Sequence, residues 1–244
     1  MNPRANETAV ESRHETAWDG YWSRARGAER PGMYERCAEF YRRQFISRFG
    51  AHLLAPYLRN EPGRHYLHAG CGSGGSDQRL AFDKPTFHEL DYSMVALQMN
   101  RQRAMPIRRR FLCGDLLALP YRSETIDGIF NFGVMEHFDE EAIGRILAEF
   151  HRVLKPDGRL IVFWPPVFGL SVLALSSWLG IVNRFRRQPL QLYPDEISRL
   201  KSFGWARALL ARHRFRVVRM QFGWRDLFTQ VGIVAEKAPE GGTS

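Results

Sequence analysis

Cysteine and lysine are scarce in this chain, and an apolar leader segment is missing. The three cysteines, Cys37, Cys71 and Cys113, are odd in number and widely spaced, and no two of them form a C-x-x-C pair. This pattern argues against a disulfide framework and a zinc site, and it indicates a reducing compartment. Residues 1–13 are polar and lack the apolar core of a secretory signal. We therefore expect a cytoplasmic protein and predict no metal site.

The positive charge comes almost entirely from arginine, because lysine occurs at only four positions. The formal net charge is +9 and the isoelectric point is near 9.9. A basic surface suits nucleic acid, anionic lipid or an acidic substrate, but scattered arginine is more typical of a solvated face. With 244 residues, 44% of them hydrophobic, the chain can bury one core. We expect one domain.

A cluster of glycines follows a short apolar run that begins at residue 65. Gly70, Gly72 and Gly74 have no Cβ atom, so the backbone can lie flat against a ligand and adopt the positive φ angles of a tight strand-to-helix turn. These glycines match the G-x-G-x-G pattern usual for S-adenosylmethionine. With Gly75, the first two also match the dinucleotide pattern G-x-G-x-x-G. The loop alone predicts a nucleotide-type pocket and leaves both cofactors open.

Short apolar strands alternate with helices after this loop. Strands are predicted over 86–90, 111–113, 125–132 and 159–164, and an amphipathic helix is predicted over 140–154. This alternation predicts a parallel sheet with right-handed crossovers. Asp91 lies 21 positions after Gly70, where a doubly wound fold places an acid that accepts hydrogen bonds from ribose hydroxyls.

The remaining segments have other patterns. Helices are predicted over 33–49 and 52–58, before the first strand, and over 192–212. Two β-rich runs, 214–222 and 228–235, have no helix between them and predict an antiparallel hairpin. The predicted organisation is a flexible tail at 1–17, one domain at 18–237 and a flexible tail at 238–244. The domain contains N-terminal helices at 33–60, a cofactor-binding core at 65–164, an apolar cap and helical insertion at 165–212 and the hairpin at 214–236.

From residue 66 to residue 163 the sequence resembles the class I S-adenosylmethionine-dependent methyltransferases, in particular the small-molecule group that includes quinone-biosynthesis enzymes. The resemblance rests on five motifs in family order, at 67–74, 90–93, 111–120, 127–138 and 152–160. It implies an α/β, Rossmann-like fold. This fold is a doubly wound, seven-stranded sheet that is mostly parallel, with an antiparallel last strand and helices on both faces.

The resemblance also implies S-adenosylmethionine as the cofactor, and residues that would bind it. Asp91 would hold the ribose, and Asp115 would accept a hydrogen bond from the exocyclic amine of the adenine. The full set expected at the cofactor is His68, Gly70, Cys71, Gly72, Gly74, Asp91, Tyr92, Gly114, Asp115, Leu116, Asn131 and Phe132.

Position 68 departs from the family pattern. The family usually carries Asp or Glu two residues before the first glycine, where the carboxylate helps to hold the methionine amino group, and here the residue is His68. Because an imidazole cannot make that contact, we expect water or backbone carbonyls to hold the ammonium. Some metal-assisted quinone methyltransferases use two Glu and a His in this neighbourhood, but Glu136-His137 is preceded by no second Glu. The resemblance therefore implies no metal site.

Methyl transfer from a sulfonium is an in-line displacement that needs no covalent enzyme intermediate. Orientation of the acceptor can therefore supply most of the acceleration, about 7–11 kcal/mol. A hydroxyl or ammonium acceptor must also lose a proton. His137 is the candidate base because imidazole ordinarily titrates near neutrality. The alternative is that this histidine supports the backbone or the cofactor.

An apolar stretch, 167–182, follows two prolines and ends near Arg184, Arg186 and Arg187. It is too short for a comfortable bilayer span, which needs about 20 residues. A helix that is apolar all round is normally buried, which predicts a cap over the acceptor pocket or a homodimer contact. The alternative is that residues 167–187 contact an anionic inner-membrane surface peripherally and admit a lipid-like acceptor.

We predict an enzyme that methylates a small, apolar or amphipathic molecule. A nucleic-acid methyltransferase is disfavoured, because residues 131–134 read Asn-Phe-Gly-Val rather than Asn/Asp-Pro-Pro-aromatic and no RNA-binding module is visible. A non-catalytic S-adenosylmethionine-binding protein that offers its apolar cap to a partner is an alternative of another class. A nicotinamide oxidoreductase would leave Asp115 and the terminal hairpin unexplained.

Overall fold

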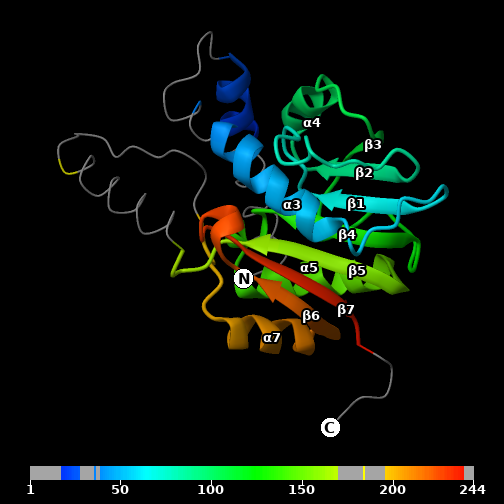
Figure 1. The fold of residues 1–244 in the computed structure, drawn as a ribbon, viewed down its shortest axis with the longest axis vertical. Helices are drawn as coiled ribbons and strands as arrows, with labels where there is room; N and C mark the ends of the chain where they lie inside the picture. Colours follow the sequence, from blue (N-terminus) through cyan, green and yellow to red (C-terminus); the bar gives the residue numbers. More distant parts are fainter. Residues whose placement is uncertain (1–17, 28–35, 37–38, 170–183, 185–195, 239–244) are drawn as a thin grey trace, which may run out of the picture.

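A seven-stranded sheet forms the centre of the molecule (Figure 1). The structure is a computed structural model, and it describes residues 18–27, 36, 39–169, 184 and 196–238. The strands, in the order in which they lie side by side, are β3 (Arg108–Cys113), β2 (Thr86–Asp91), β1 (His65–Ala69), β4 (Ile126–Phe132), β5 (Leu154–Trp164), β7 (Val231–Lys237) and β6 (Phe215–Gln221).

The strand directions confirm the predicted fold class. Strands β1 to β5 run parallel, whereas β7 lies antiparallel between β5 and β6. The strand order reverses at β1, because β2 and β4 lie on its two sides. In open α/β sheets, ligands bind beyond the carboxyl ends of the strands at such a switch point. The site is therefore expected at the end of β1, next to the glycines.

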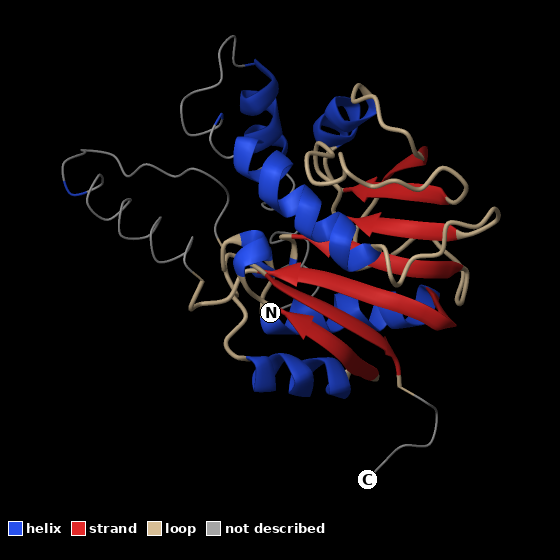
Figure 2. Ribbon diagram, viewed as in Figure 1, coloured by secondary structure: helices blue, strands red, loops and turns tan. Residues whose placement is uncertain are grey.

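Helices cover both faces of this sheet. On one face, α3 (Ser47–Leu54) buries Phe49 and Leu53. On the other, α5 (Glu140–Val153) and α7 (Phe203–Arg212) bury Ile146 and Leu209 against the sheet. Figure 2 shows α3 crossing in front of the strands, with α5 behind them. The predicted stripe of apolar residues on α5 is confirmed, and the helix begins where the Asp139 carboxylate accepts the Ala142 N–H at 2.8 Å.

The expected break between two N-terminal helices near residue 50 is wrong. Helical structure runs without interruption from residue 39 through η1 (Arg42–Ile46) and α3, and it stops at Leu54. A Cβ atom on Gly50 would lie 2.5 Å from the Phe132 ring. The glycine is therefore required for close packing of the helix on the sheet rather than for a break.

The predicted helix over 192–212 is also too long. Residues 192–195 lie outside the described residues, residues 196–202 are not helical, and α7 starts after Ser202, whose Oγ accepts the Trp205 N–H at 3.1 Å. The Leu200 N–H donates to Pro165 O at 3.0 Å, and Leu200 O accepts from Val167 N at 3.1 Å. These bonds use the backbone groups that a helix would need, and they attach this segment to the end of β5.

Several predicted features lie outside the described residues. They are the tail 1–17, the part of the N-terminal helix at 33–35 and 37–38, most of the apolar stretch with its last arginines (170–183 and 185–195), and the end of the C-terminal tail (239–244). Across the part of the chain that the structure describes, no helix is long and apolar enough to cross a membrane.

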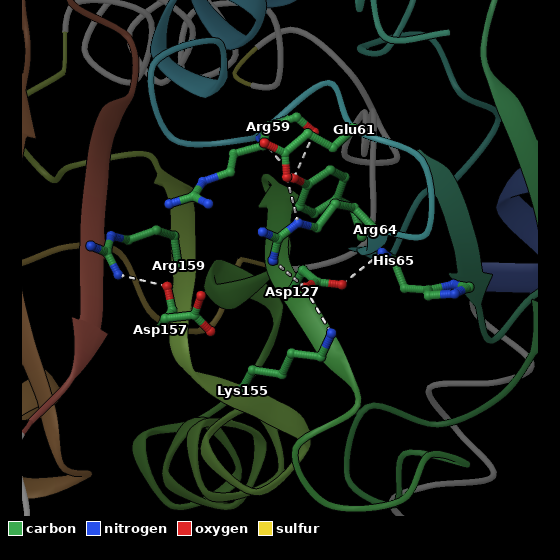
Figure 3. A network of polar contacts seen from close by, with 9 residues as sticks. Arg59, Glu61, Arg64, His65, Asp127, Lys155, Asp157 and Arg159 are labelled. Carbon is green, nitrogen blue, oxygen red and sulfur yellow. Dashed lines mark hydrogen bonds and ion pairs between the residues drawn. The ribbon is translucent and has the colours of Figure 1, made fainter. Parts of the chain in front are cut away.

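Asp127 ties together the amino ends of three neighbouring strands (Figure 3). Its Oδ1 accepts hydrogen bonds from Arg64 Nη1 and Lys155 Nζ, and its Oδ2 accepts the His65 N–H, each at 2.8 Å. The Asp127 side chain is only 3% exposed. Burial opposes ionisation, but the bonds to Lys155, His65 and Arg64 lower the pKa of Asp127 overall. The carboxylate thus holds β1, β4 and β5 at the edge opposite the glycines.

We expect Asp127→Asn to destabilise the fold by about 2 kcal/mol, because it leaves buried donors around a neutral amide. The depressed pKa means that the carboxylate contributes stability above its ordinary pKa near 4 and loses it as the pH falls through the lower folded value. Denaturant unfolding at pH 7 and pH 3 should therefore show that the difference in unfolding free energy between wild type and variant is smaller at pH 3. An equal difference at the two pH values would contradict this role.

Candidate cofactor and acceptor site

The glycine bend, residues 70–74, leaves β1 at the carboxyl edge of the sheet. Gly70, Gly72 and Gly74 have φ angles of 71°, 52° and 70°, which confirms the positive values expected from the sequence. The N–H groups of Gly70 and Cys71 donate to Leu90 O at 2.8 and 3.0 Å. The end of β2 therefore holds the bend in place.

Side chains at the bend glycines would collide with their surroundings. A Cβ atom on Gly70 would lie 2.7 Å from Val134 Cγ2, and one on Gly74 would lie 2.2 Å from Asn100 Oδ1. Real Cβ atoms do not approach other atoms so closely. The bend is thus a turn that only glycine can form, because the protein's own side chains fill the space around these positions.

Asp91 lies beside the bend, as expected for a ribose-binding acid. Its Oδ2 accepts the Gly72 N–H at 2.7 Å, and its Oδ1 accepts the Ser93 N–H at 2.9 Å. Burial raises the pKa of this carboxyl, although both N–H groups act against the rise. Each carboxylate oxygen has a second lone pair, so Asp91 can bind these N–H groups and still accept from a diol.

The end of β3 joins the same edge. The Gly114 N–H donates to Asp91 O at 3.1 Å, and Asp115 Oδ1 accepts the Leu117 N–H at 2.9 Å. Leu116, the next residue, is buried in the hydrophobic core. Tyr92, at the end of β2, is 39% exposed. The structure thus brings Asp91 and Asp115 to neighbouring strand ends next to the bend.

The end of β4 supplies the remaining predicted residues. Asn131 is fully buried, and neither its Oδ1 nor its Nδ2 has a hydrogen-bond partner among the described residues. Phe132 stacks on Phe163 at 4.4 Å between ring centroids. His137 lies in the short helix η2 (Met135–His137), where its N–H donates to Val134 O at 3.1 Å and its side chain is 8% exposed.

An aromatic helix that the sequence left unassigned, residues 18–27, covers this edge. The Trp18 ring meets the His137 ring edge-on, with 4.8 Å between centroids. A Cβ on Gly72 would lie 3.0 Å from the Trp22 ring, and Ser93 Oγ donates to Asp19 at 2.5 Å. The tryptophans therefore form one wall of the candidate site. Trp18, Tyr21 and Trp22 stand close together in the sequence, but this spacing alone does not distinguish contact with a ligand from packing on the domain.

Glu136 is a buried acid next to His137 that sequence reasoning gave no role in binding or catalysis. It is 5% exposed, its Oε2 has no partner among the described residues, and burial raises its pKa to about 8. Because the folded pKa lies above the unfolded value near 4.3, the folded state binds more protons between these values. Its burial therefore costs stability progressively as the pH rises from about 5 to 8.

We expect Glu136→Gln to remove this pH dependence. The melting temperature of the wild type should fall more steeply than that of the variant between pH 5 and pH 8.5, and the variant should be the more stable protein at pH 8.5. Thermal unfolding followed by circular dichroism measures both slopes. Glu141→Gln, at an exposed position of α5, is the matched control and should behave as wild type. Parallel slopes for wild type and Glu136→Gln would contradict a protonated Glu136.

His68 does not line the bend as a free side chain. It is 1% exposed, and its Nδ1 lies 2.8 Å from Asp77 Oδ2 and 3.2 Å from Glu89 Oε2. Sequence reasoning missed these two acids, because one comes from the loop after the bend and the other from the neighbouring strand. One nitrogen of His68 and one carboxylate oxygen each of Asp77 and Glu89 lie within 4.8 Å of one another, and atoms of these types also serve as metal ligands.

Comparisons with known proteins agree with this geometry. The methyltransferase domain family matches residues 67–162. A demethylmenaquinone methyltransferase from Corynebacterium kroppenstedtii is 33% identical over 198 residues, which cover 73% of this chain and 76% of the relative. One from Renibacterium salmoninarum is 32% identical over 136 residues, covering 52% of this chain and 55% of the relative. The chain thus spans only about half the length of some of the relatives that it matches.

A solved structure shares the fold. Magnesium protoporphyrin IX methyltransferase from Synechocystis, with bound S-adenosylhomocysteine, superposes with a TM-score of 0.66 at 17% identity and covers 95% of this chain and 100% of the other. The sheet order, the glycine bend and the sequence relatives lead to the same conclusion. The chain belongs to the class I S-adenosylmethionine-dependent methyltransferases of the small-molecule type.

Proposed function

We propose that this chain transfers a methyl group from S-adenosylmethionine to a small apolar or amphipathic acceptor. The observation that carries the proposal is the bare glycine bend with Asp91 and Asp115 at the neighbouring strand ends. Bound there, the cofactor supplies an electrophilic methyl group on a sulfonium. In this arrangement the methionine tail lies along the bend, Asp91 holds the ribose hydroxyls, and Asp115 accepts from the adenine amine.

The acceptor side is formed by His137 and the tryptophans of helix 18–27. The Trp18 indole packs against the His137 imidazole, so an apolar surface lies next to a basic side chain. Such a surface orients a flat or apolar acceptor and excludes water, and orientation is the main requirement of an in-line displacement. His137 would take the proton when the acceptor is a hydroxyl or an ammonium.

An apolar acceptor is further supported by the described start of the apolar stretch. Val167 and Phe168 are 47% and 39% exposed, although both are large and apolar. We propose that residues 167–187 rest on an anionic inner-membrane surface and admit a lipid-like acceptor. Sedimentation with anionic vesicles tests this contact. Binding that is lost when Trp178 and Leu179 are replaced by charged residues supports it, and no binding contradicts it.

The reaction itself is tested with methyl-labelled S-adenosylmethionine and a cell extract divided into lipid, polar-metabolite and RNA fractions. We expect enzyme-dependent label in the lipid fraction or among the less polar metabolites. Asp91→Ala is the negative control, because it removes the proposed ribose contact. Label in the RNA fraction alone would overturn the acceptor class, and no label in any fraction would favour a non-catalytic binding protein.

A further inference from the structure

A buried cluster of three ionisable residues lies behind the glycine bend. His68 on β1 and Glu89 on β2 are paired in the sheet register, and Asp77 comes from the loop that follows the bend. All three are at most 1% exposed. His68 Nδ1 is within hydrogen-bond distance of both carboxylates, at 2.8 Å from Asp77 and 3.2 Å from Glu89. A single N–H group is therefore shared between two acids.

The cluster contains more acceptors than donors. Asp77 Oδ1 and Glu89 Oε1 are buried acceptors without a hydrogen-bond partner among the described residues, and His68 Nε2, which is a donor in the imidazolium form, is also unpaired there. Asn100 Nδ2 from α4 (Met94–Arg101) donates to Glu89 Oε2 at 3.3 Å, and Arg109 from β3 donates to Asn100 Oδ1 at 2.8 Å. The Arg109 guanidinium reaches the cluster only through this amide.

These neighbours determine the protonation state of His68. Burial alone would lower the pKa of the imidazole, but the charges and hydrogen bonds of Asp77 and Glu89 raise it well above its ordinary value. Burial raises the pKa of Asp77 to about 6, against the lowering effect of His68. The two acids therefore favour the imidazolium form of His68.

The field of this cluster reaches the bend. Burial, followed by the carboxylates of Glu89, Asp91 and Asp77, raises the pKa of the Cys71 thiol well above its ordinary value. Cys71 lies between the first two bend glycines, and His68 and Asp77 stand two residues before and three residues after the bend, so the charges of the cluster lie close to the turn. A cation near the bend would be stabilised by the same charges.

We propose that His68, Asp77 and Glu89 act as one positioning unit with a single net negative charge behind the glycine bend. The imidazolium keeps the two carboxylates together and ties the far end of the glycine loop to β1 and β2. The remaining charge favours a cationic sulfonium over a neutral thioether at the bend. This inference rests on the proposed function, because it concerns the same cofactor site.

The test compares the binding of S-adenosylmethionine and S-adenosylhomocysteine at pH 8 by calorimetry. The two ligands differ by the methyl group and by the positive charge on sulfur. Asp77→Asn removes one negative charge and leaves the His68–Glu89 pair. We expect binding of S-adenosylmethionine to weaken about tenfold and that of S-adenosylhomocysteine about threefold, as for a charge acting through a partly polar medium. Asp157→Asn, an exposed residue at the opposite edge of the sheet, removes the same charge as the control and should change neither.

Nuclear magnetic resonance of histidine-labelled wild type provides an independent measurement that needs no variant and no ligand. We expect the His68 ring nitrogens to show the imidazolium signature at pH 8. A neutral ring, equal losses for both ligands in Asp77→Asn, or a stoichiometric divalent cation in the purified protein that Asp77→Asn loses would overturn the inference. Wild type that binds neither ligand would overturn the proposed function instead, while the imidazolium measurement would still report on the cluster.

Discussion

Asp91→Ala is expected to raise the dissociation constant for S-adenosylmethionine by about 100-fold or more. In the proposed function the carboxylate accepts two ribose hydroxyls, and hydrogen bonds to a charged acceptor contribute about 1.5–3 kcal/mol each. It also holds the Gly72 and Ser93 N–H groups at 2.7 and 2.9 Å, so its loss loosens the bend itself. Both effects weaken the binding of the cofactor.

Calorimetric titration of wild type, Asp91→Asn and Asp91→Ala measures this loss. The Asn variant keeps one acceptor oxygen and should lie between the other two proteins. A melting temperature close to that of wild type separates a local effect from general unfolding. Unchanged affinity in Asp91→Ala would show that the ribose is not bound at this strand end.

Gly74→Ala is expected to destabilise the fold by about 4 kcal/mol. The residue has a φ of 70°, a conformation that costs about 1 kcal/mol or more for alanine, and the new Cβ would lie 2.2 Å from Asn100 Oδ1. Overpacking in a filled interior adds about 1–3 kcal/mol. Asn100 is itself held by Glu89 and Arg109, so it cannot move away without breaking those bonds.

Gly63→Ala is the matched control for this prediction. Gly63 has a φ of 79°, but a Cβ there would meet nothing within 4 Å. The two variants therefore share the backbone strain and differ in the collision. Urea unfolding should give a loss of about 1 kcal/mol for Gly63→Ala and a clearly larger one for Gly74→Ala. Equal losses would contradict the collision with Asn100.

The parallel sheet, the terminal hairpin and the glycine bend could be predicted from the sequence because all three follow from local patterns. Alternating strands and helices specify a parallel sheet. The two β-rich runs near the C-terminus have no helix between them, and this specifies the antiparallel hairpin. Positive φ angles at Gly70, Gly72 and Gly74 follow from the absence of Cβ atoms. The nearness of Asp91 to the bend follows from the doubly wound topology.

The features that the sequence did not predict have a common physical cause. Each depends on contacts between residues that are distant in sequence. The sequence predicts two helices, 33–49 and 52–58, because the contact that explains Gly50, the Phe132 ring, lies 82 positions away. The extended segment around Leu200 is specified by bonds to Pro165 and Val167 rather than by its own propensity. His68 looked like a missing acid because Asp77 and Glu89 become its neighbours only when the chain folds.

The most direct test of the whole account is a calorimetric titration of the purified wild type with S-adenosylmethionine and, separately, with NADH. The glycine bend with its two strand-end acids predicts saturable binding of S-adenosylmethionine at one site per chain and no binding of NADH. Binding of NADH, or no heat from S-adenosylmethionine in a folded sample, would contradict the assignment of this site.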